Sequence, residues 1–330
     1  APPTSSTLEN DILLQHILLK SLLKVSAKYK PDTMSHAFPT SFLNPILARS
    51  LSSDPTVRLI VQVIFHQLLD RHNNLPRLAR PLSLTSPDKL TIEKALRADL
   101  MFMRKHGPEL LLHIYDNIQI KNNSVKNFNA IYTTLALMCV EMNSEETLTE
   151  LLRLTFAIQD FATMKNSDLD ETHRSFIHCL VAGFLHLIGH LTAIPTLCAH
   201  IEQVIKARHE KAPWLLPDSS ETETYKGTSN RSRQNSFEEI AEEFLFNKGT
   251  IAEALRSTGH DTKKLLTSFM PRNVGTFYYF NLFLIISKND IIQLTNLSVD
   301  ATMTRSISDL NNITVEVESV GSSPTIIRVI

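Results

Sequence analysis

Three histidines in the middle of the chain have the spacing of metal ligands. His186 and His190 lie four residues apart, so both would project from one face of a helix, and His178 lies two helical turns earlier. A zinc-peptidase motif needs a glutamate directly after the first histidine, but this chain has Leu187 there. No third ligand is evident beside the pair, and the chain has 13 histidines. We therefore expect structural histidines, with a metal-dependent enzyme as the alternative.

A second polar cluster, Asp70-Arg71-His72-Asn73-Asn74, has the residue types of a kinase catalytic loop in the wrong order. Neither a glycine-rich loop nor a DFG motif accompanies it. The cluster follows an amphipathic helical pattern. We therefore expect these residues to cap the carbonyl groups at the end of that helix or to line a surface.

The remaining catalytic signatures are missing from the sequence. No GxSxG nucleophile elbow occurs, which disfavours the lipid-hydrolase alternative. Adjacent glutamates fall where the first turns or solvated faces of helices are expected, because acids are favoured at the positive end of a helix. These pairs are Glu145-Glu146, Glu238-Glu239 and Glu242-Glu243. The sequence predicts no catalytic residues, no metal site and no cofactor.

A regulatory site is suggested where two arginines precede two serines in a polar segment. Ser232 and Ser236 are the candidate phosphorylation sites, and Ser236 is also the expected N-cap of the next helix. A phosphate there would face the positive end of that helix but would also approach Glu238 and Glu239. The alternative is a solvated linker that ends in a serine cap.

The elements that would position these residues follow the helical period of 3.6 residues. Asp54 and Pro55 have the residue types of an N-cap and a first helical position, and Ser124 and Ser144 are further N-cap candidates. The basic residues and Gly107-Pro108 at positions 104–108 predict a helix end. Helices are expected at 8–28, 39–51, from 55 onward, and at 109–121, 124–142, 144–165, 171–192 and 194–212.

Short connections make consecutive helices antiparallel neighbours. The helix pairs that begin at 124 and 171 start 47 residues apart, near the period of HEAT or armadillo units. No convincing strand pattern interrupts the helices before residue 213. We therefore predict an all-α fold, an armadillo/HEAT-like helical solenoid over residues 1–217 with a flexible C-terminal tail.

Beyond the solenoid the composition changes. Residues 218–235 are almost entirely polar and predict a disordered linker. Residues 236–259 predict amphipathic helices at 237–247 and 250–257, which either dock a partner or cap the solenoid's own core. Residues 260–330 predict a mostly irregular tail, with an apolar stretch at 277–286 and an alternating run at 313–317 able to add a strand to a partner. The hypothetical partner-binding residues are Phe237, Ile240, Phe244, Leu245, Ile251 and Leu255.

Composition narrows the function classes. The chain has 33 basic and 34 acidic residues, a net charge of −1, which argues against a nucleic-acid partner. Phosphate-binding loops need glycine, and a content of 8 glycines against 15 prolines argues against nucleotide-binding α/β folds. Three cysteines without CxxC spacing, Cys139, Cys179 and Cys198, predict small buried side chains in a reducing, cytosolic compartment. No continuous apolar run is long enough to span a bilayer.

Four segments together resemble one known family, and the resemblance covers about residues 19–255 and resumes near 304. The chain is similar to the C-terminal portion of proteins of the Rolling blackout, or eighty-five-requiring, family. These proteins are plasma-membrane scaffolds for type III alpha phosphatidylinositol 4-kinase. The segments are Leu19–Ser26, Leu68–Asn73, Phe102–Gly107 and Lys211–Pro217.

The resemblance implies an armadillo/HEAT-like rod without catalytic activity, at the cytoplasmic face of the plasma membrane. It implies two partners, a tetratricopeptide-repeat adaptor and a hyccin-type subunit, which carry the lipid kinase. Family members attach to the membrane through an N-terminal cysteine cluster that this sequence lacks. Membrane association would therefore depend on regions absent from this chain. An unrelated helical-repeat adaptor is the remaining alternative.

Overall fold

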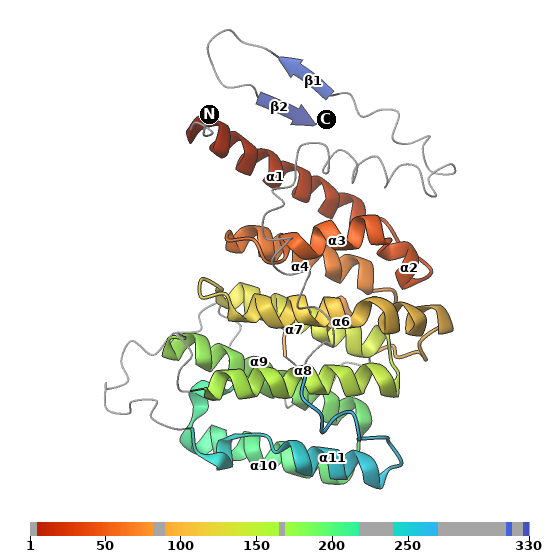
Figure 1. The fold of residues 1–330 in the computed structure, drawn as a ribbon, viewed down its shortest axis with the longest axis vertical. Coiled ribbons are helices and arrows are strands. Elements are labelled where there is room, and N and C mark those ends of the chain that lie inside the picture. The colour runs from red at the N-terminus through yellow and green to blue at the C-terminus, as the bar shows by residue number, and fades with distance from the viewer. Residues whose placement is uncertain are drawn as a thin grey trace. The chain divides into compact units, whose positions relative to one another are not determined.

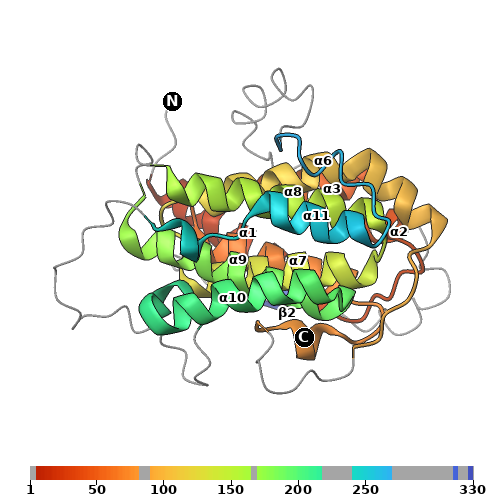
Figure 2. The ribbon, with the colours of Figure 1, turned by 90° about the horizontal axis from the view of Figure 1, so that it is seen from below.

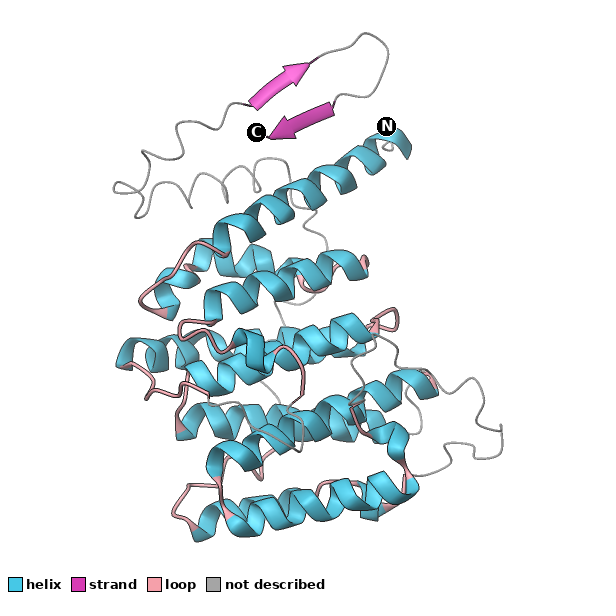
Figure 3. Ribbon diagram, turned by 180° about the vertical axis from the view of Figure 1, so that it is seen from behind, coloured by secondary structure: helices cyan, strands magenta, loops and turns pink. Residues whose placement is uncertain are grey.

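The structure is a computed structural model, which describes residues 5–81, 90–164, 169–217, 240–269, 315–318 and 326–329. The chain divides into two compact units, residues 1–279 and 280–330. Helices make up the first unit (Figures 1 and 3). Its α-helices are α1 (Ser5–Ser26), α2 (Met34–Ala37), α3 (Thr40–Arg49), α4 (Pro55–Leu69), α5 (Leu75–Leu78), α6 (Arg97–Gln119), α7 (Val125–Glu141), α8 (Glu145–Thr163), α9 (Glu171–Thr192), α10 (Pro195–Lys211) and α11 (Lys248–Ser257).

The long helices of the first unit form two layers. Helices α3, α6 and α8 lie in one layer, and α4, α7 and α9 lie in the other (Figure 2). Within the second layer α4 packs on α7, and α7 packs on α9. Helix α1 contacts α4 at one end of the stack, while α10 and α11 lie together at the other end. This is the arrangement of an all-α helical solenoid, as the sequence predicts.

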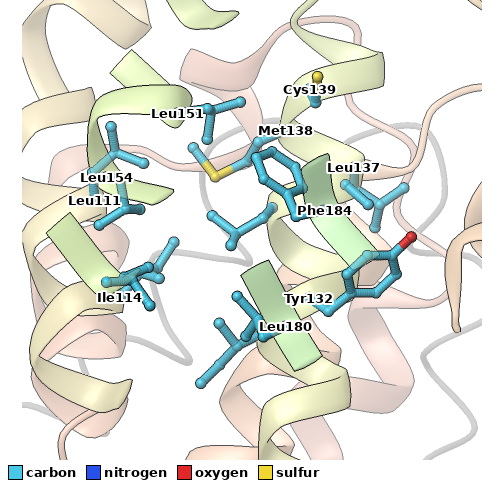
Figure 4. Close-up of a cluster of buried hydrophobic side chains, with 14 of the residues drawn as sticks. Leu111, Ile114, Tyr132, Leu137, Met138, Cys139, Leu151, Leu154, Leu180 and Phe184 are labelled. Carbon is cyan, nitrogen blue, oxygen red and sulfur yellow. The ribbon is translucent and has the colours of Figure 1, made fainter. Parts of the chain in front are cut away.

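The core is continuous through the stack. Apolar side chains from α6, α7, α8 and α9 meet between the layers, where Leu111, Met138, Leu151 and Phe184 are buried (Figure 4). Cys139 belongs to this cluster, and burial raises the pKa of its thiol to about 12. The cysteine is therefore a protonated, apolar side chain in the core, as the sequence analysis expects.

Helix α9 is both long and rich in apolar residues. It alone, among the residues described, has the length and composition to cross a membrane, with a mean hydropathy of 1.5 over its most apolar 18 residues. However, 67% of the apolar window is buried inside the protein. Its Gly183 allows close approach of the chain, because a Cβ there would lie 3.0 Å from Pro81. The helix is therefore explained as the core helix of the stack.

The N-cap residues that the sequence predicts for three helices are confirmed. Asp54 caps α4 by accepting a hydrogen bond from the amide of Thr56 at 2.7 Å. Ser124 and Asn127 form a capping box at the start of α7, and Ser144 caps α8. These contacts span only two or three residues, so a local sequence pattern is enough to predict them.

The expected helix end at residues 104–108 is wrong. Helix α6 continues through Gly107 and Pro108 to Gln119. Residues on both sides of the proline, among them Met103 and Leu110, are buried. Burial of the two halves of the helix outweighs the missing proline hydrogen bond, because packing of apolar surface is worth several kcal/mol in total.

The helix expected at 237–247 is also wrong for residues 240–247, the part of it that the structure describes. Residues 242–244 form only a 3-10 turn, η2 (Glu242–Phe244), with extended residues on both sides. A similar turn, η1 (Pro213–Leu215), follows α10. The second expected helix is confirmed as α11, which is capped by Asn247 and followed by Gly259 at φ +93°.

The described part of the second unit is a pair of strands, β1 (Val315–Glu318) and β2 (Ile326–Val329). They pair antiparallel, with Val317 opposite Ile327. The strand expected at 313–317 therefore pairs within this chain, whereas the sequence suggested pairing with a partner. Ile313 and the apolar stretch at 277–286 lie outside the described residues.

Candidate functional site

One cavity in the first unit is lined by charged residues from four segments. The loop after α1, the loop after α4, the extended segment before α6 and the end of α7 enclose a volume of about 420 Å³. We call this cavity the corner pocket. Its lining residues are Lys30, Pro31, Asp32, Arg71, His72, Asn73, Glu93, Lys94, Leu96 and Glu141.

The loop at residues 70–74 closes one side of the pocket. Asp70 ends α4, and its carboxylate accepts a hydrogen bond from the amide of Asn74 at 2.7 Å. Lys30 Nζ donates to the carbonyl oxygen of Asp70 at 3.1 Å. Asn73 adopts a left-handed backbone with φ 58°, which turns the chain sharply. Of the two alternatives for this cluster, lining a surface holds for Arg71, His72 and Asn73, which line the pocket. The end of α4 is capped by the backbone amide of Asp70, which donates to the carbonyl of His66.

Two carboxylates that pair with the lining residues Arg71 and His72 are completely buried. The side chain of Glu141 has no exposed surface, and its Oε2 lies 2.6 Å from His72 Nδ1. Its Oε1 accepts a hydrogen bond from Asn74 Nδ2 at 2.9 Å. Both oxygens of this acid are therefore satisfied, which a buried carboxylate requires.

Asp99 is the other buried carboxylate. Its Oδ2 pairs with Arg71 Nη1 at 2.7 Å, and its Oδ1 accepts the backbone amide of Met34 at 2.8 Å. The same guanidinium donates through Nη2 to the carbonyl of Glu141 at 2.8 Å. Arg71 also donates to the carbonyl of Asp32 at 3.3 Å, so it ties together the loop after α1, the start of α6 and the end of α7.

The three histidines of helix α9 do not form a metal site. His178 is completely buried, His186 is partly buried and His190 is exposed. Burial and the charges of Arg208 and Arg174 lower the pKa of His178 to about 3. Within the described ranges no group of three or more His, Cys, Asp or Glu side chains could hold a metal ion.

Residues 240–269 pack on the solenoid. We call residues 240–269 the C-terminal strap. Arg208 on α10 is completely buried and donates through Nε to the carbonyl of Phe244 at 2.8 Å. Its Nη1 donates to the carbonyls of His178 at 3.0 Å and Leu215 at 2.9 Å. The guanidinium also lies 4.7 Å from the centre of the Phe246 ring.

A second contact holds the strap against α8. Gln159 donates to the carbonyl of Phe246 and accepts its amide, both at 3.0 Å. Farther along, Leu265 is buried and Arg153 donates to the carbonyl of Ser268. Residues 260–269 are irregular, as expected, but they pack on the solenoid.

Several of the hypothetical docking residues lie in the strap and are buried or partly buried there. Ile251 and Leu255 are buried in the chain's own core, so in this structure they are capping residues and are not available to a partner. Ile240, Phe244 and Leu245 are partly buried. Phe237 and the two hypothetical phosphorylation sites, Ser232 and Ser236, lie outside the described residues.

Four of the polar residues that organise these sites are not among those predicted from the sequence. Glu141 follows an apolar run in α7, and Arg208 and Gln159 lie on faces that turn inward. A charged or amide residue at an apolar helical position is a usable signal of a buried network. Asp99 gave no such signal, because acids are common in the first turn of a helix.

Comparison with known proteins identifies relatives of this chain. The EFR3 armadillo-repeat family matches residues 2–256. EFR3 homolog B of Mus musculus is 35% identical over 272 residues, covering 82% of this chain and 33% of the relative. The EFR3 homolog of Caenorhabditis elegans is 36% identical over 276 residues, covering 79% and 31%.

A third relative extends over nearly all of the sequence. EFR3 homolog cmp44E of Drosophila melanogaster is 29% identical over 332 residues, covering 99% of this chain and 37% of the relative. The chain thus spans about a third of the length of these relatives. No solved structure matches the chain.

Proposed function

The chain belongs to the EFR3 family of armadillo-repeat proteins, and we propose that it is part of a non-catalytic scaffold. The scaffold helps to recruit a phosphatidylinositol 4-kinase complex to the plasma membrane through protein–protein contacts. The observation that carries this proposal is the family match over residues 2–256, which coincides with a two-layer helical stack. Stacked helical repeats build extended surfaces suited to binding other proteins.

We propose two partners on the basis of the family resemblance. A tetratricopeptide-repeat adaptor and a hyccin-type subunit would link the scaffold to the kinase. The site of action would be the cytoplasmic face of the plasma membrane. The near-zero net charge of −1 supports a protein partner over nucleic acid.

The geometry gives the enzyme alternatives no support. A metal-dependent reaction would need His178, whose ring is buried in the core and whose pKa of about 3 reflects its removal from water. In the corner pocket, His72 pairs with Glu141 and Arg71 pairs with Asp99, and the lining residues include no serine, threonine or cysteine nucleophile. The pocket therefore supports binding.

Affinity purification tests the proposal directly. The 330-residue chain would be tagged, expressed in cells and purified under mild conditions, with co-purifying proteins identified by mass spectrometry. We expect the tetratricopeptide-repeat adaptor, the hyccin-type subunit and the kinase to be enriched over a tag-only control. Recovery of a different set of partners, or stoichiometric zinc in the purified chain, would refute the proposal.

A further inference from the structure

We propose that His200 on α10 is a proton-sensitive latch for the C-terminal strap. In its neutral form the imidazole ring holds the start of α11 against the solenoid. When the ring takes up a proton, that contact is lost and residues 244–257 of the strap loosen. The inference concerns a conformational change within this chain and does not depend on the proposed scaffold function.

The latch is a hydrogen bond whose direction is fixed. The backbone amide of Asn247 donates to Nε2 of His200 at 3.0 Å. A backbone amide can only donate, so Nε2 is the acceptor nitrogen and the proton of the neutral ring lies on Nδ1. A protonated imidazole carries a hydrogen on both nitrogens and offers no acceptor. This contact therefore exists only while His200 is neutral.

Asn247 links the latch to α11. Its side chain caps that helix, because Oδ1 accepts a hydrogen bond from the amide of Thr250 at 2.9 Å. The ring of His200 thus lies at the N-terminal end of α11, where the helix dipole disfavours a positive charge. Protonation removes the acceptor for Asn247 and places a cation at this end, so both effects favour displacement of the cap.

The segment before α11, residues 244–247, depends on contacts of this kind because it forms neither an α-helix nor a strand. Solenoid side chains bind its backbone. Gln159 binds the amide and the carbonyl of Phe246, and Arg208 binds the carbonyl of Phe244. Together with the latch, four described hydrogen bonds of this type hold the segment. The loss of one of them therefore weakens its attachment.

Burial lowers the pKa of His200 below its ordinary value of 6.5. Helix α10 packs against α9, α11, η1 and η2, and η1 contains no titratable residue. None of the neighbouring charges shifts the pKa of His200. On each of the other elements, the titratable groups closest to the latch along the chain are His186 and His190 on α9, Cys198 and Glu202 on α10, Glu243 in η2 and Lys248 on α11.

The direction of the response follows from this lowered pKa. In an open strap the ring is in water and titrates near pH 6.5, so the open state binds the proton more readily than the closed state. Closure is therefore complete above pH 6.5 and weakens as the pH falls below it. At pH 5.5 the equilibrium constant for opening is expected to be up to about tenfold larger than at pH 7.5.

Hydrogen exchange of the 330-residue chain, read by mass spectrometry, tests the latch. Exchange is followed at pH 7.5, 6.5 and 5.5, and each rate is divided by the intrinsic rate at that pH to give an opening constant. We expect the constant for peptides within residues 244–257 to rise as the pH falls. At each pH these peptides should open more readily than those from the buried middle of α9, residues 177–189.

A conservative variant separates the proton from the contact. In His200→Gln the side-chain carbonyl takes the place of Nε2 and accepts from the amide of Asn247 at every pH, so the contact stays and the proton response is lost. His209→Gln is the matched control, because His209 is exposed on the same helix, and it should respond as the wild type does.

A second measurement covers the case in which His200→Gln opens the strap already at pH 7.5. An NMR titration of the wild-type chain should give His200 a midpoint below pH 6.5 and the same midpoint for the amide shift of Asn247. A His200 titration that leaves the Asn247 amide unaffected would overturn the latch.

Two exchange results would overturn it as well. The first is an opening constant that does not change with pH in the wild type, or that rises equally in His200→Gln. The second is an equal opening constant for the strap and for α9 at each pH, which would assign the acid response to unfolding of the whole chain.

Discussion

Arg208 and His178 are neighbouring buried side chains that differ in charge at pH 7, because the guanidinium is charged and the imidazole is neutral. Burial lowers the pKa of Arg208 to about 10, so the guanidinium keeps its charge at pH 7. It does so because backbone carbonyls accept its hydrogens and the Phe246 ring covers it. His178 has no hydrogen-bond partner on either ring nitrogen among the described residues, so its ring stays neutral.

The first prediction concerns acid stability. An unfolded histidine titrates near pH 6.5, whereas burial lowers the pKa of His178 to about 3. The unfolded chain binds the proton more readily, so stability is complete above pH 6.5 and falls as the pH drops toward 3. At pH 5 the loss from this residue is about 2 kcal/mol. His66, whose burial lowers its pKa to about 4, adds a similar loss.

Urea unfolding at pH 7 and pH 5 measures this effect. His178→Leu is expected to recover about 2 kcal/mol of the acid loss, since leucine cannot take up a proton. His190→Gln is the control, because His190 is exposed on the same helix. Equal acid loss in wild type and His178→Leu would show that the buried histidine does not drive the pH dependence.

The second prediction concerns the guanidinium that holds the C-terminal strap. Arg208→Met leaves the carbonyls of Phe244, His178 and Leu215 without this donor. We expect a loss of about 3 kcal/mol or more in unfolding free energy, together with faster hydrogen exchange at the Phe246 amide. Arg256→Met removes an exposed ion pair with Glu253 and should change stability by less than about 1 kcal/mol. Unchanged exchange in Arg208→Met would contradict the anchoring role.

At the scale of the helix, local signals predict starts better than ends. The caps at Asp54, Ser124 and Ser144 depend on contacts within three residues, so the sequence predicts them correctly. The continuation of α6 through Pro108 depends on burial along the whole helix, which residues 104–108 alone do not reveal. Long-range partners were missed for the same reason: Gln159 and Phe246 are 87 residues apart.

The third prediction concerns the proline inside α6. Pro108 is exposed and lies inside the helix, where it lacks an amide hydrogen. Pro108→Ala is expected to raise the unfolding free energy by about 1–3 kcal/mol, because alanine restores a donor and favours helix. Pro195→Ala, at the first position of α10, is the control and should be nearly neutral. A destabilised Pro108→Ala would mean that the packing around α6 depends on the proline.

At the scale of the molecule, the sequence predicts the helical stack but does not predict the corner pocket. Helical periodicity and short connections predict the all-α solenoid, which the family match bears out. The corner pocket was not predictable as a cavity. Its residues come from four segments between positions 30 and 141, and only Asp70–Asn74 attracted attention as a cluster. The choice between the two expectations for residues 236–259, docking a partner or capping the solenoid, depends on the burial of Ile251 and Leu255 in the structure.

The central claim is that this helical stack is a protein-binding scaffold. The most direct measurement is the binding of the purified 330-residue chain to a purified complex of the tetratricopeptide-repeat adaptor and the hyccin-type subunit, by isothermal titration calorimetry. We predict saturable binding with a stoichiometry of one, and tighter binding than to either a helical-repeat protein of another family or serum albumin. Absence of heat and of co-elution on size exclusion, at concentrations well above those in cells, would contradict the account.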